Sequence, residues 1–238
     1  MAKLLYEGKA KQVFATEDPA VVLVHYKDDA TALNGQKRGT IVGKGAVNNQ
    51  MSNYLFAELE KNGVPTHLIR EVNERDTLVK LVKIVPLEVI VRNIAAGSLA
   101  QRLGVPEGTE LKCTVLEFCY KSDELGDPML NDYHIRAIAL ATDEEVKTIS
   151  EMALRINGLL QKRLLEAGLM LVDFKLEFGK LPDGSIILAD EISPDTCRLW
   201  DVETRAKLDK DRFRRDMGGA EEAYQEVYRR LGLEEQHD

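Results

Sequence analysis

The segment LVDFKLEFG, residues 171–179, constrains the fold most strongly, because apolar and charged residues alternate along it. Successive side chains of a β-strand point to opposite faces of its sheet. Asp173, Lys175 and Glu177 therefore share one face of a predicted strand, and apolar side chains occupy the other. A run rich in Ile and Leu, residues 185–192, follows a Pro-Asp-Gly turn. The two runs are therefore predicted to form a β-hairpin.

The second strand of this hairpin ends in two carboxylates, Asp190 and Glu191. The hairpin places Asp190 opposite the Lys175 region and diagonal to Glu177. Carboxylates that approach each other repel unless a cation lies between them, and Mg²⁺ binds one or two carboxylates together with phosphate oxygens and water. Glu177 and Asp190 are therefore candidate Mg²⁺ ligands, and Lys175 would neutralise the site or steer an anionic substrate. A half-exposed strand with a solvated charged face is the alternative.

Hydrophobic patterns along the rest of the chain predict an α+β fold. Runs typical of strands lie mainly in the first third, at residues 4–14, 20–27, 66–71 and 77–85. Helices are predicted at residues 46–59, 98–104, 142–168 and 220–232. Strands that precede most of the helices are typical of α+β proteins. We expect a mainly antiparallel β amino-terminal lobe at residues 1–85 and a larger mixed α/β lobe at residues 86–238, since Pro86 interrupts the β pattern.

Composition and charge exclude several classes of function. The 238 residues include 32 Lys and Arg against 40 Asp and Glu, which gives a net charge of −8. Proteins that coat nucleic acid or an anionic membrane need a basic surface, so neither partner is expected, whereas local lysines still permit an anionic small-molecule substrate. No secretory signal or membrane-spanning stretch is expected. Three cysteines without a CxxC pair favour a cytoplasmic location.

Lysines near Gly8 form a second candidate site. In YEGKAKQVF, Gly8 separates two strand-like halves, and Lys9 and Lys11 lie one alternation apart. Backbone amides beside a glycine, together with lysine charge, suit a polyphosphate, although the Walker A spacing is absent. A solvated lysine hairpin is the commoner structure for such a pattern. Lys80 is the one charge on an otherwise apolar strand face, so it either reaches water at an edge or pairs with a buried anion such as a nucleotide phosphate.

Two further segments carry residues suited to an anionic ligand. Arg92 ends a predicted strand, and Gly97 and Ser98 open a helix whose amino-terminal N–H groups attract anions. An N-cap at Ser98 with Arg92 on the surface is an equal alternative. Asp195 and Arg198 lie three residues apart after the hairpin, so they either pair with each other or bind one ligand together.

These segments, in this order, resemble the SAICAR synthetase family across essentially the whole chain. The matching segments are VPLEVIVRNIAAGS and LVDFKLEFG, which are the most specific, and GKAKQVF, VNNQMSNYLF, DPMLND, DEISPDTCRLWD and DKDRFRRDMGG. The resemblance implies a two-lobed, kinase-like or ATP-grasp-like fold with ATP between the lobes. Thr196 and Cys197 depart from the Gly-Ser of many relatives, so the backbone of that loop is expected to differ slightly.

The resemblance also implies a role for each candidate residue. The nucleotide site would consist of Lys9, Ala10, Lys11, Val13, Lys80, Glu88 and Glu177. The ribonucleotide site would consist of Arg92, Gly97, Ser98, Asp127, Asp195 and Arg198. Lys175, Asp195 and Arg198 would be the catalytic residues, and Glu177 and Asp190 would hold Mg²⁺.

The activity implied by the resemblance is that of an ATP-dependent carbon–nitrogen ligase of purine biosynthesis. It would join the carboxylate of carboxyaminoimidazole ribonucleotide (CAIR) to L-aspartate, through an acyl phosphate, and release SAICAR, ADP and phosphate. ATP and Mg²⁺ would be required, and the protein would be a homodimer. A small-molecule kinase of related fold and a non-catalytic nucleotide-sensing module are the alternatives. Phosphate release that depends on aspartate would distinguish the ligase from both.

Overall fold

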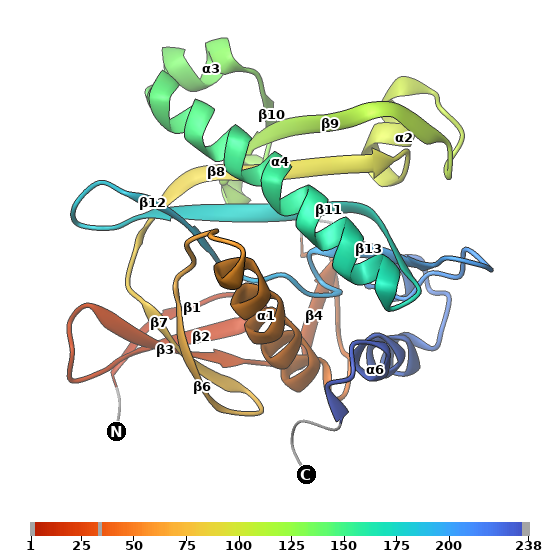
Figure 1. Cartoon of the computed structure of the whole chain (residues 1–238), viewed down its shortest axis with the longest axis horizontal. Helices are drawn as coiled ribbons and strands as arrows, with labels where there is room; N and C mark the ends of the chain where they lie inside the picture. The colour runs from red at the N-terminus through yellow and green to blue at the C-terminus, as the bar shows by residue number, and fades with distance from the viewer. Residues whose placement is uncertain (1–2, 33–34, 235–238) are drawn as a thin grey trace.

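The computed structural model describes residues 3–32 and 35–234, and most of its strands form two antiparallel sheets (Figure 1). The amino-terminal sheet has the order β1-β2-β3-β7-β6. Its strands are β1 (Leu4–Glu7), β2 (Lys11–Ala15), β3 (Val21–Tyr26), β6 (Leu68–Asn73) and β7 (Asp76–Lys80). The Gly8 N–H donates to the Lys11 carbonyl at 2.8 Å, which closes the turn between β1 and β2.

The second sheet is built around a long central strand, β11. The order is β10-β9-β8-β11-β12, and β13 also pairs with β11. The strands are β8 (Lys83–Ile94), β9 (Glu110–Tyr120), β10 (Met129–Leu130), β11 (Leu169–Lys180), β12 (Ile186–Ala189) and β13 (Cys197–Asp201). Glu177 pairs with Ala189, so the predicted hairpin is confirmed and Asp190 follows directly at the end of β12. A separate two-stranded sheet contains β4 (Asp29–Ala32) and β5 (Lys37–Thr40).

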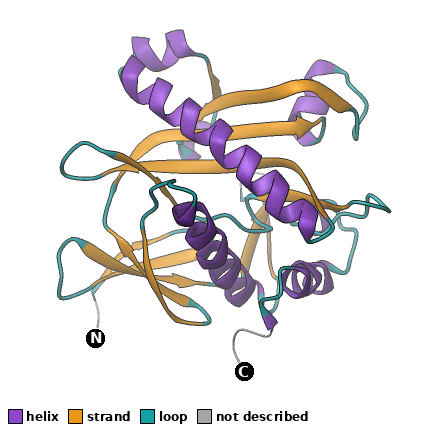
Figure 2. Ribbon diagram, viewed as in Figure 1, coloured by secondary structure: helices purple, strands orange, loops and turns teal. Residues whose placement is uncertain are grey.

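Two long helices cover these sheets (Figure 2). Helix α4 crosses the second sheet and contacts β11 and β8, and α1 packs against the amino-terminal strands, α4 and α6. The helices are α1 (Lys44–Lys61), α2 (Gly97–Leu103), α3 (Asp132–Ala137), α4 (Asp143–Glu166), α5 (Asp211–Arg214) and α6 (Ala220–Arg230), with a 3₁₀ turn at Asp123–Leu125. Among the described helices, none combines the length and apolar composition needed to cross a membrane.

The apolar face of β11 forms the main hydrophobic core together with α1 and α4. Phe174, Leu176 and Phe178 are buried there beside Met51 of α1 and Ile156 of α4. Full burial of such a side chain contributes about 1.5–3 kcal/mol. The alternation predicted for this strand is confirmed, because the opposite face carries the charged residues that line the cavity described below.

The prediction of a two-lobed α+β fold is confirmed: an antiparallel β part precedes a larger part that mixes helices and strands. The run predicted at residues 77–85 is not one strand, however. Strand β7 ends at Lys80, and β8 begins at Lys83 in the other sheet. The chain passes from one sheet to the next between these residues, so Lys80 does not share a strand face with the apolar residues that follow it. The lobe boundary at residue 85 stays a prediction.

Candidate active site

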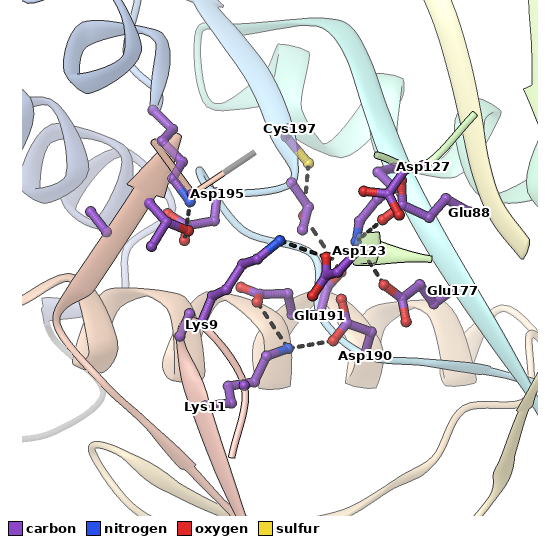
Figure 3. A pocket seen from close by; sticks show the side chains of 18 of the residues that line it. Lys9, Lys11, Glu88, Asp123, Asp127, Glu177, Asp190, Glu191, Asp195 and Cys197 are labelled. Carbon is purple, nitrogen blue, oxygen red and sulfur yellow. Dashed lines mark hydrogen bonds and ion pairs between the residues drawn. The ribbon is translucent and has the colours of Figure 1, made fainter. Parts of the chain in front are cut away.

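A cavity of about 950 Å³ is lined by charged side chains from both sheets (Figure 3). Its walls come from the β1–β2 turn, β8, β11 and the loop that joins β12 to β13. Within residues 3–32 and 35–234, ten basic and ten acidic side chains line it, so the cavity is balanced in charge although the whole chain has a net charge of −8. This local concentration of cations suits anionic ligands, which the acidic surface elsewhere would repel.

Lys11 joins the amino-terminal sheet to the end of β12. Its ammonium group lies 2.5 Å from Asp190 Oδ1 and 2.9 Å from Glu191 Oε1, and Figure 3 shows both contacts. Asp190 has a φ of 62°, a left-handed conformation that few residues other than Gly, Asn and Asp adopt, and the chain turns out of β12 there. Burial would raise the pKa of Asp190, but the Lys11 and Lys175 ammonium groups lower it, so the carboxylate is ionised.

A second group of ion pairs surrounds Glu177. Lys175 Nζ donates to Glu177 Oε1 at 2.6 Å and to Glu88 Oε1 at 3.0 Å. Lys121 Nζ donates to the same Glu177 oxygen at 2.9 Å. Burial would lower the pKa of Lys175, but Glu177 and Asp190 raise it, so the ammonium group stays charged. Sequence patterns did not single out Lys121, because it lies alone in the loop after β9.

Glu177 and Asp190 fit a hard divalent cation by the chemistry of their donor atoms. Both carboxylates line the cavity. Their hydrogen bonds within the described chain use Glu177 Oε1 and Asp190 Oδ1, so each has a second oxygen that can face a cation. Among the described residues, no three His, Cys, Asp or Glu side chains form a metal-binding cluster. Mg²⁺ at this site would therefore need phosphate oxygens and water to complete its coordination.

Asp173 aligns two arginines elsewhere in the cavity. Its Oδ2 accepts hydrogen bonds from Arg92 Nη1 at 2.8 Å and from Arg198 Nη1 at 2.9 Å. Arg92 is buried and also donates to Ser98 Oγ at 3.2 Å, and Arg198 Nε donates to Asp211 at 2.9 Å. Guanidinium groups held in fixed orientations at a cavity wall favour a phosphate or carboxylate ligand.

Three of the predicted site residues do not line the cavity. Gly97 has a φ of 50°, and a Cβ there would collide with the Arg198 guanidinium, so this glycine makes room for Arg198. Val13 is not among the lining residues, and the Lys80 ammonium donates to the Thr66 carbonyl at 3.0 Å. The predicted residues that do line the cavity are Lys9, Ala10, Lys11, Glu88, Arg92, Ser98, Asp127, Lys175, Glu177, Asp190, Asp195 and Arg198.

The Asp195 carboxylate is occupied by donors from three other parts of the chain. Lys44 Nζ, at the start of α1, lies 2.9 Å from Oδ2, and Lys210 Nζ lies 3.0 Å from the same oxygen. The Tyr224 hydroxyl of α6 donates to Oδ1. We call these four residues the Asp195 cluster. Burial would raise the pKa of Asp195, but Lys210 and Lys44 lower it. Its three partners lie 151, 15 and 29 residues away and share no local pattern with Asp195, so the sequence did not single them out as site residues.

The fold and the cavity together define a protein of mixed helices and antiparallel sheets with a charged cavity suited to anionic small molecules. The SAICAR synthetase family model matches residues 4–231. The chain is 60% identical to the phosphoribosylaminoimidazole-succinocarboxamide synthase of Lachnoclostridium phytofermentans over 230 residues, and this alignment covers 97% of each of the two chains. It is 59% identical to the same synthase of Coprothermobacter proteolyticus over 229 residues, and this alignment covers 96% of this chain and 97% of the relative.

Solved structures agree with these sequence relatives. The phosphoribosylaminoimidazole-succinocarboxamide synthase from Ehrlichia chaffeensis has a TM-score of 0.95 at 45% identity, over 97% of this chain and 98% of that one. A SAICAR synthetase in complex with ADP has a TM-score of 0.92 at 48% identity, over 95% of this chain and 96% of that one. The chain belongs to the SAICAR synthetase family.

Proposed function

We propose that the protein is an ATP-dependent carbon–nitrogen ligase that joins the carboxylate of CAIR to the amine of L-aspartate, giving SAICAR, ADP and phosphate. The observation that carries this proposal is that two side-chain pairs of opposite charge, each suited to a phosphate-bearing ligand in a different way, open into one cavity. One is the carboxylate pair suited to Mg²⁺, Glu177 and Asp190, and the other is the arginine pair, Arg92 and Arg198. The relatives described above carry the name of this synthase, and one related structure contains ADP.

The reaction requires activation because a carboxylate is a poor acyl donor. Transfer of the γ-phosphoryl group of ATP to a carboxylate oxygen of CAIR gives an acyl phosphate and ADP. The amine nitrogen of aspartate then bonds to the acyl carbon, the bond from that carbon to the phosphate oxygen breaks, and the nitrogen loses a proton to phosphate or water. The protein contributes mainly by positioning three anions and neutralising their charge.

The β1–β2 turn and the end of β12 would bind the nucleotide. Lys9, Ala10 and Lys11 line the cavity there, and the contact from Lys11 to Asp190 places its charge beside a candidate metal ligand. Glu177 and Asp190 would hold Mg²⁺, which supplies charge neutralisation for the phosphates when it is bound. The remaining nucleotide residues would be Glu88 in the cavity wall, with Val13 and Lys80, which do not line the cavity.

The arginine pair would bind the phosphate of the ribonucleotide. Arg92, Ser98 and Arg198 lie within one hydrogen-bonded group with Asp173, and Gly97 allows Arg198 to approach. Asp127 and Asp195 would complete the ribonucleotide site. Lys175, which is close to both Glu177 and Glu88, would face the reacting carboxylate. Asp195 and Arg198 would assist by fixing the cations around it.

We infer three further properties. The nucleotide-covering lobe would comprise residues 1–85, and the lobe that carries the metal and ribonucleotide sites would comprise residues 86–238. The protein would be a homodimer, as the family resemblance suggests. It would act in the cytoplasm, a location supported by the free thiols of Cys113, Cys119 and Cys197.

A coupled assay with ATP, CAIR and L-aspartate tests the proposed activity. Phosphate release should require all three substrates, and SAICAR should form in the same amount as ADP. A small-molecule kinase would instead form ADP without aspartate and accumulate a stable phosphorylated product. A nucleotide-sensing module would bind ATP and form no ADP. Either of these outcomes would overturn the proposal.

A further inference from the structure

Lys44 is a fully buried cation that does not line the cavity. It is the first residue of α1, a helix that also contributes apolar residues such as Met51 and Leu55 to the main core. An ammonium group removed from water is strongly unfavourable unless it is paired. Its ion pair with Asp195, at 2.9 Å, satisfies this requirement. The pairing places a charge of α1 directly behind a residue of the cavity wall.

Helix α1 contacts the loop between β12 and β13 at two points. Lys44 and Ser52 lie two turns apart, so they share one face of the helix. Ser52 Oγ donates to the Ile192 carbonyl at 3.1 Å and accepts from the Ile192 N–H at 3.2 Å. Lys44 binds Asp195 three residues further along the same loop. The loop is therefore attached to a helix that is itself fixed in the core.

The Asp195 cluster is also linked to the arginine pair. Lys210, which lines the cavity, binds Asp195 Oδ2 at 3.0 Å, and Arg214 Nη2 donates to the Asp195 carbonyl at 3.4 Å. Arg214 Nη1 donates to Asp211 at 2.8 Å, and Asp211 accepts from Arg198 Nε at 2.9 Å. A continuous set of ion pairs and hydrogen bonds, one of them to the Asp195 main-chain carbonyl, thus runs from α1 to the cation that would bind the ribonucleotide phosphate.

We propose that Lys44 is a positioning residue for the ribonucleotide site, which acts through Asp195 to hold Lys210 and Arg198 in the orientation that phosphate binding requires. The positive charge of Lys44 contributes to this role as well as its attachment of the loop to α1. Lys44 and Lys210 together outnumber the single negative charge of Asp195, so the cluster remains positive towards the cavity. Without Lys44, Asp195 would neutralise Lys210 alone and the loop would lose one attachment to α1. This inference rests on the proposed function, because it takes CAIR as the ligand.

The test compares Lys44→Met, Asp195→Asn and the double variant with the wild type. Calorimetric titration with CAIR in the absence of ATP measures affinity independently of turnover, and titration with ADP reports the nucleotide site. Lys44→Met should weaken CAIR binding about tenfold and leave ADP binding within about twofold. Because Lys44 acts through Asp195, the double variant should lose no more affinity than Asp195→Asn alone. Lys61→Met, at the exposed end of the same helix, should bind both ligands as the wild type does.

The double variant also keeps the test valid if Lys44→Met fails to fold. It removes both members of the buried pair and leaves no uncompensated charge from that pair. If Lys44 were merely structural, Lys44→Met would melt at lower temperature while its folded fraction kept the wild-type affinity for CAIR, and that result would overturn the proposal. Equal losses of CAIR and ADP affinity would overturn it as well. A wild type that binds CAIR but forms no SAICAR would refute the proposed function alone.

Discussion

The Lys11 ammonium group contacts Asp190 Oδ1 at 2.5 Å, although 179 residues separate the two in sequence. Glu191 Oε1 lies 2.9 Å from the same ammonium group. The contact joins β2 of the amino-terminal sheet to the end of β12 in the second sheet. One side chain therefore connects the wall proposed to cover the nucleotide with a proposed metal ligand.

Lys11→Met removes this cation while keeping much of the side-chain length. We expect the KM for ATP to rise about tenfold or more, because a hydrogen bond to a charged group contributes about 1.5–3 kcal/mol. The KM for L-aspartate should change much less. Steady-state kinetics with each substrate varied in turn provides the measurement, and Lys147→Met on the exposed side of α4 is the matched control. An unchanged KM for ATP would contradict the placement of the phosphates beside Lys11.

Glu177→Gln and Asp190→Asn each remove a negative charge with little change of shape. Formation of ADP should fall about 100-fold or more in each variant, the scale on which lost electrostatic stabilisation lowers turnover. Chelation by EDTA should abolish the activity of the wild type, and added Mg²⁺ should restore it. Glu203→Gln, an exposed carboxylate, is the control. Thermal melting would verify that the variants are folded, and near-normal turnover by the double variant would remove the metal assignment.

Arg92→Lys keeps a positive charge but loses the planar group that binds Asp173 and Ser98 together. The KM for CAIR should rise about tenfold, equivalent to about 1.4 kcal/mol, whereas the KM for ATP should remain close to that of the wild type. Lysine is preferred to alanine here because alanine would leave the buried Asp173 with one cation fewer. Equal increases in both KM values would contradict the assignment of Arg92 to the ribonucleotide site.

Two buried groups, Asp209 and His67, should make the free energy of unfolding depend on pH in opposite directions. Burial and the nearby Asp211 raise the pKa of Asp209 to about 7, so the folded chain holds this proton more tightly than the unfolded chain does. The contribution of Asp209 to the free energy of unfolding therefore decreases as pH rises from about 4 to about 7. Burial and the Lys11 charge lower the pKa of His67 to about 3. The unfolded chain binds that proton more tightly, so the His67 contribution increases with pH from about 3 to about 6.5.

Urea unfolding at a series of pH values separates the two groups. In Asp209→Asn the free energy of unfolding should rise more steeply between about pH 4 and pH 6.5 than in the wild type, because the Asp209 contribution no longer opposes that of His67. In His67→Gln the free energy of unfolding should rise less, or decrease, with pH over the same range, because the His67 contribution that increases with pH is lost. Identical pH profiles for the wild type and both variants would show that neither group changes its protonation on folding.

Local periodicity was sufficient to predict the part of the site built on β11. A period of two assigns each side chain to a face without any knowledge of the partner strands, and the structure places Lys175 and Glu177 in the cavity and Leu176 in the core. The turn that follows made the hairpin with β12 predictable as well. Asp190 could thus be located near Glu177 from the sequence alone.

Contacts between distant segments could not be predicted in the same way. Nothing near Lys44 in sequence distinguishes a buried lysine at the start of a helix from an exposed one, because its partner lies 151 residues away. The change of sheet after Lys80 also has no local signature, since apolar residues continue on both sides of it. The resemblance to a family, rather than any pattern of residues, suggested which candidates bind nucleotide and which bind ribonucleotide.

The ion pairs of the cavity also have a consequence for the way in which an anion would enter it. Lys11, Lys175 and Lys210 each already contact a carboxylate of the chain. An arriving phosphate or carboxylate would therefore replace one counterion by another, and folding has already removed much of the water around these partly buried ammonium groups. The carboxylates released by this exchange would include Asp190 and Glu177, the proposed ligands of a divalent cation. Under the proposed function, entry of an anion and entry of a cation would thus be two halves of a single exchange of counterions.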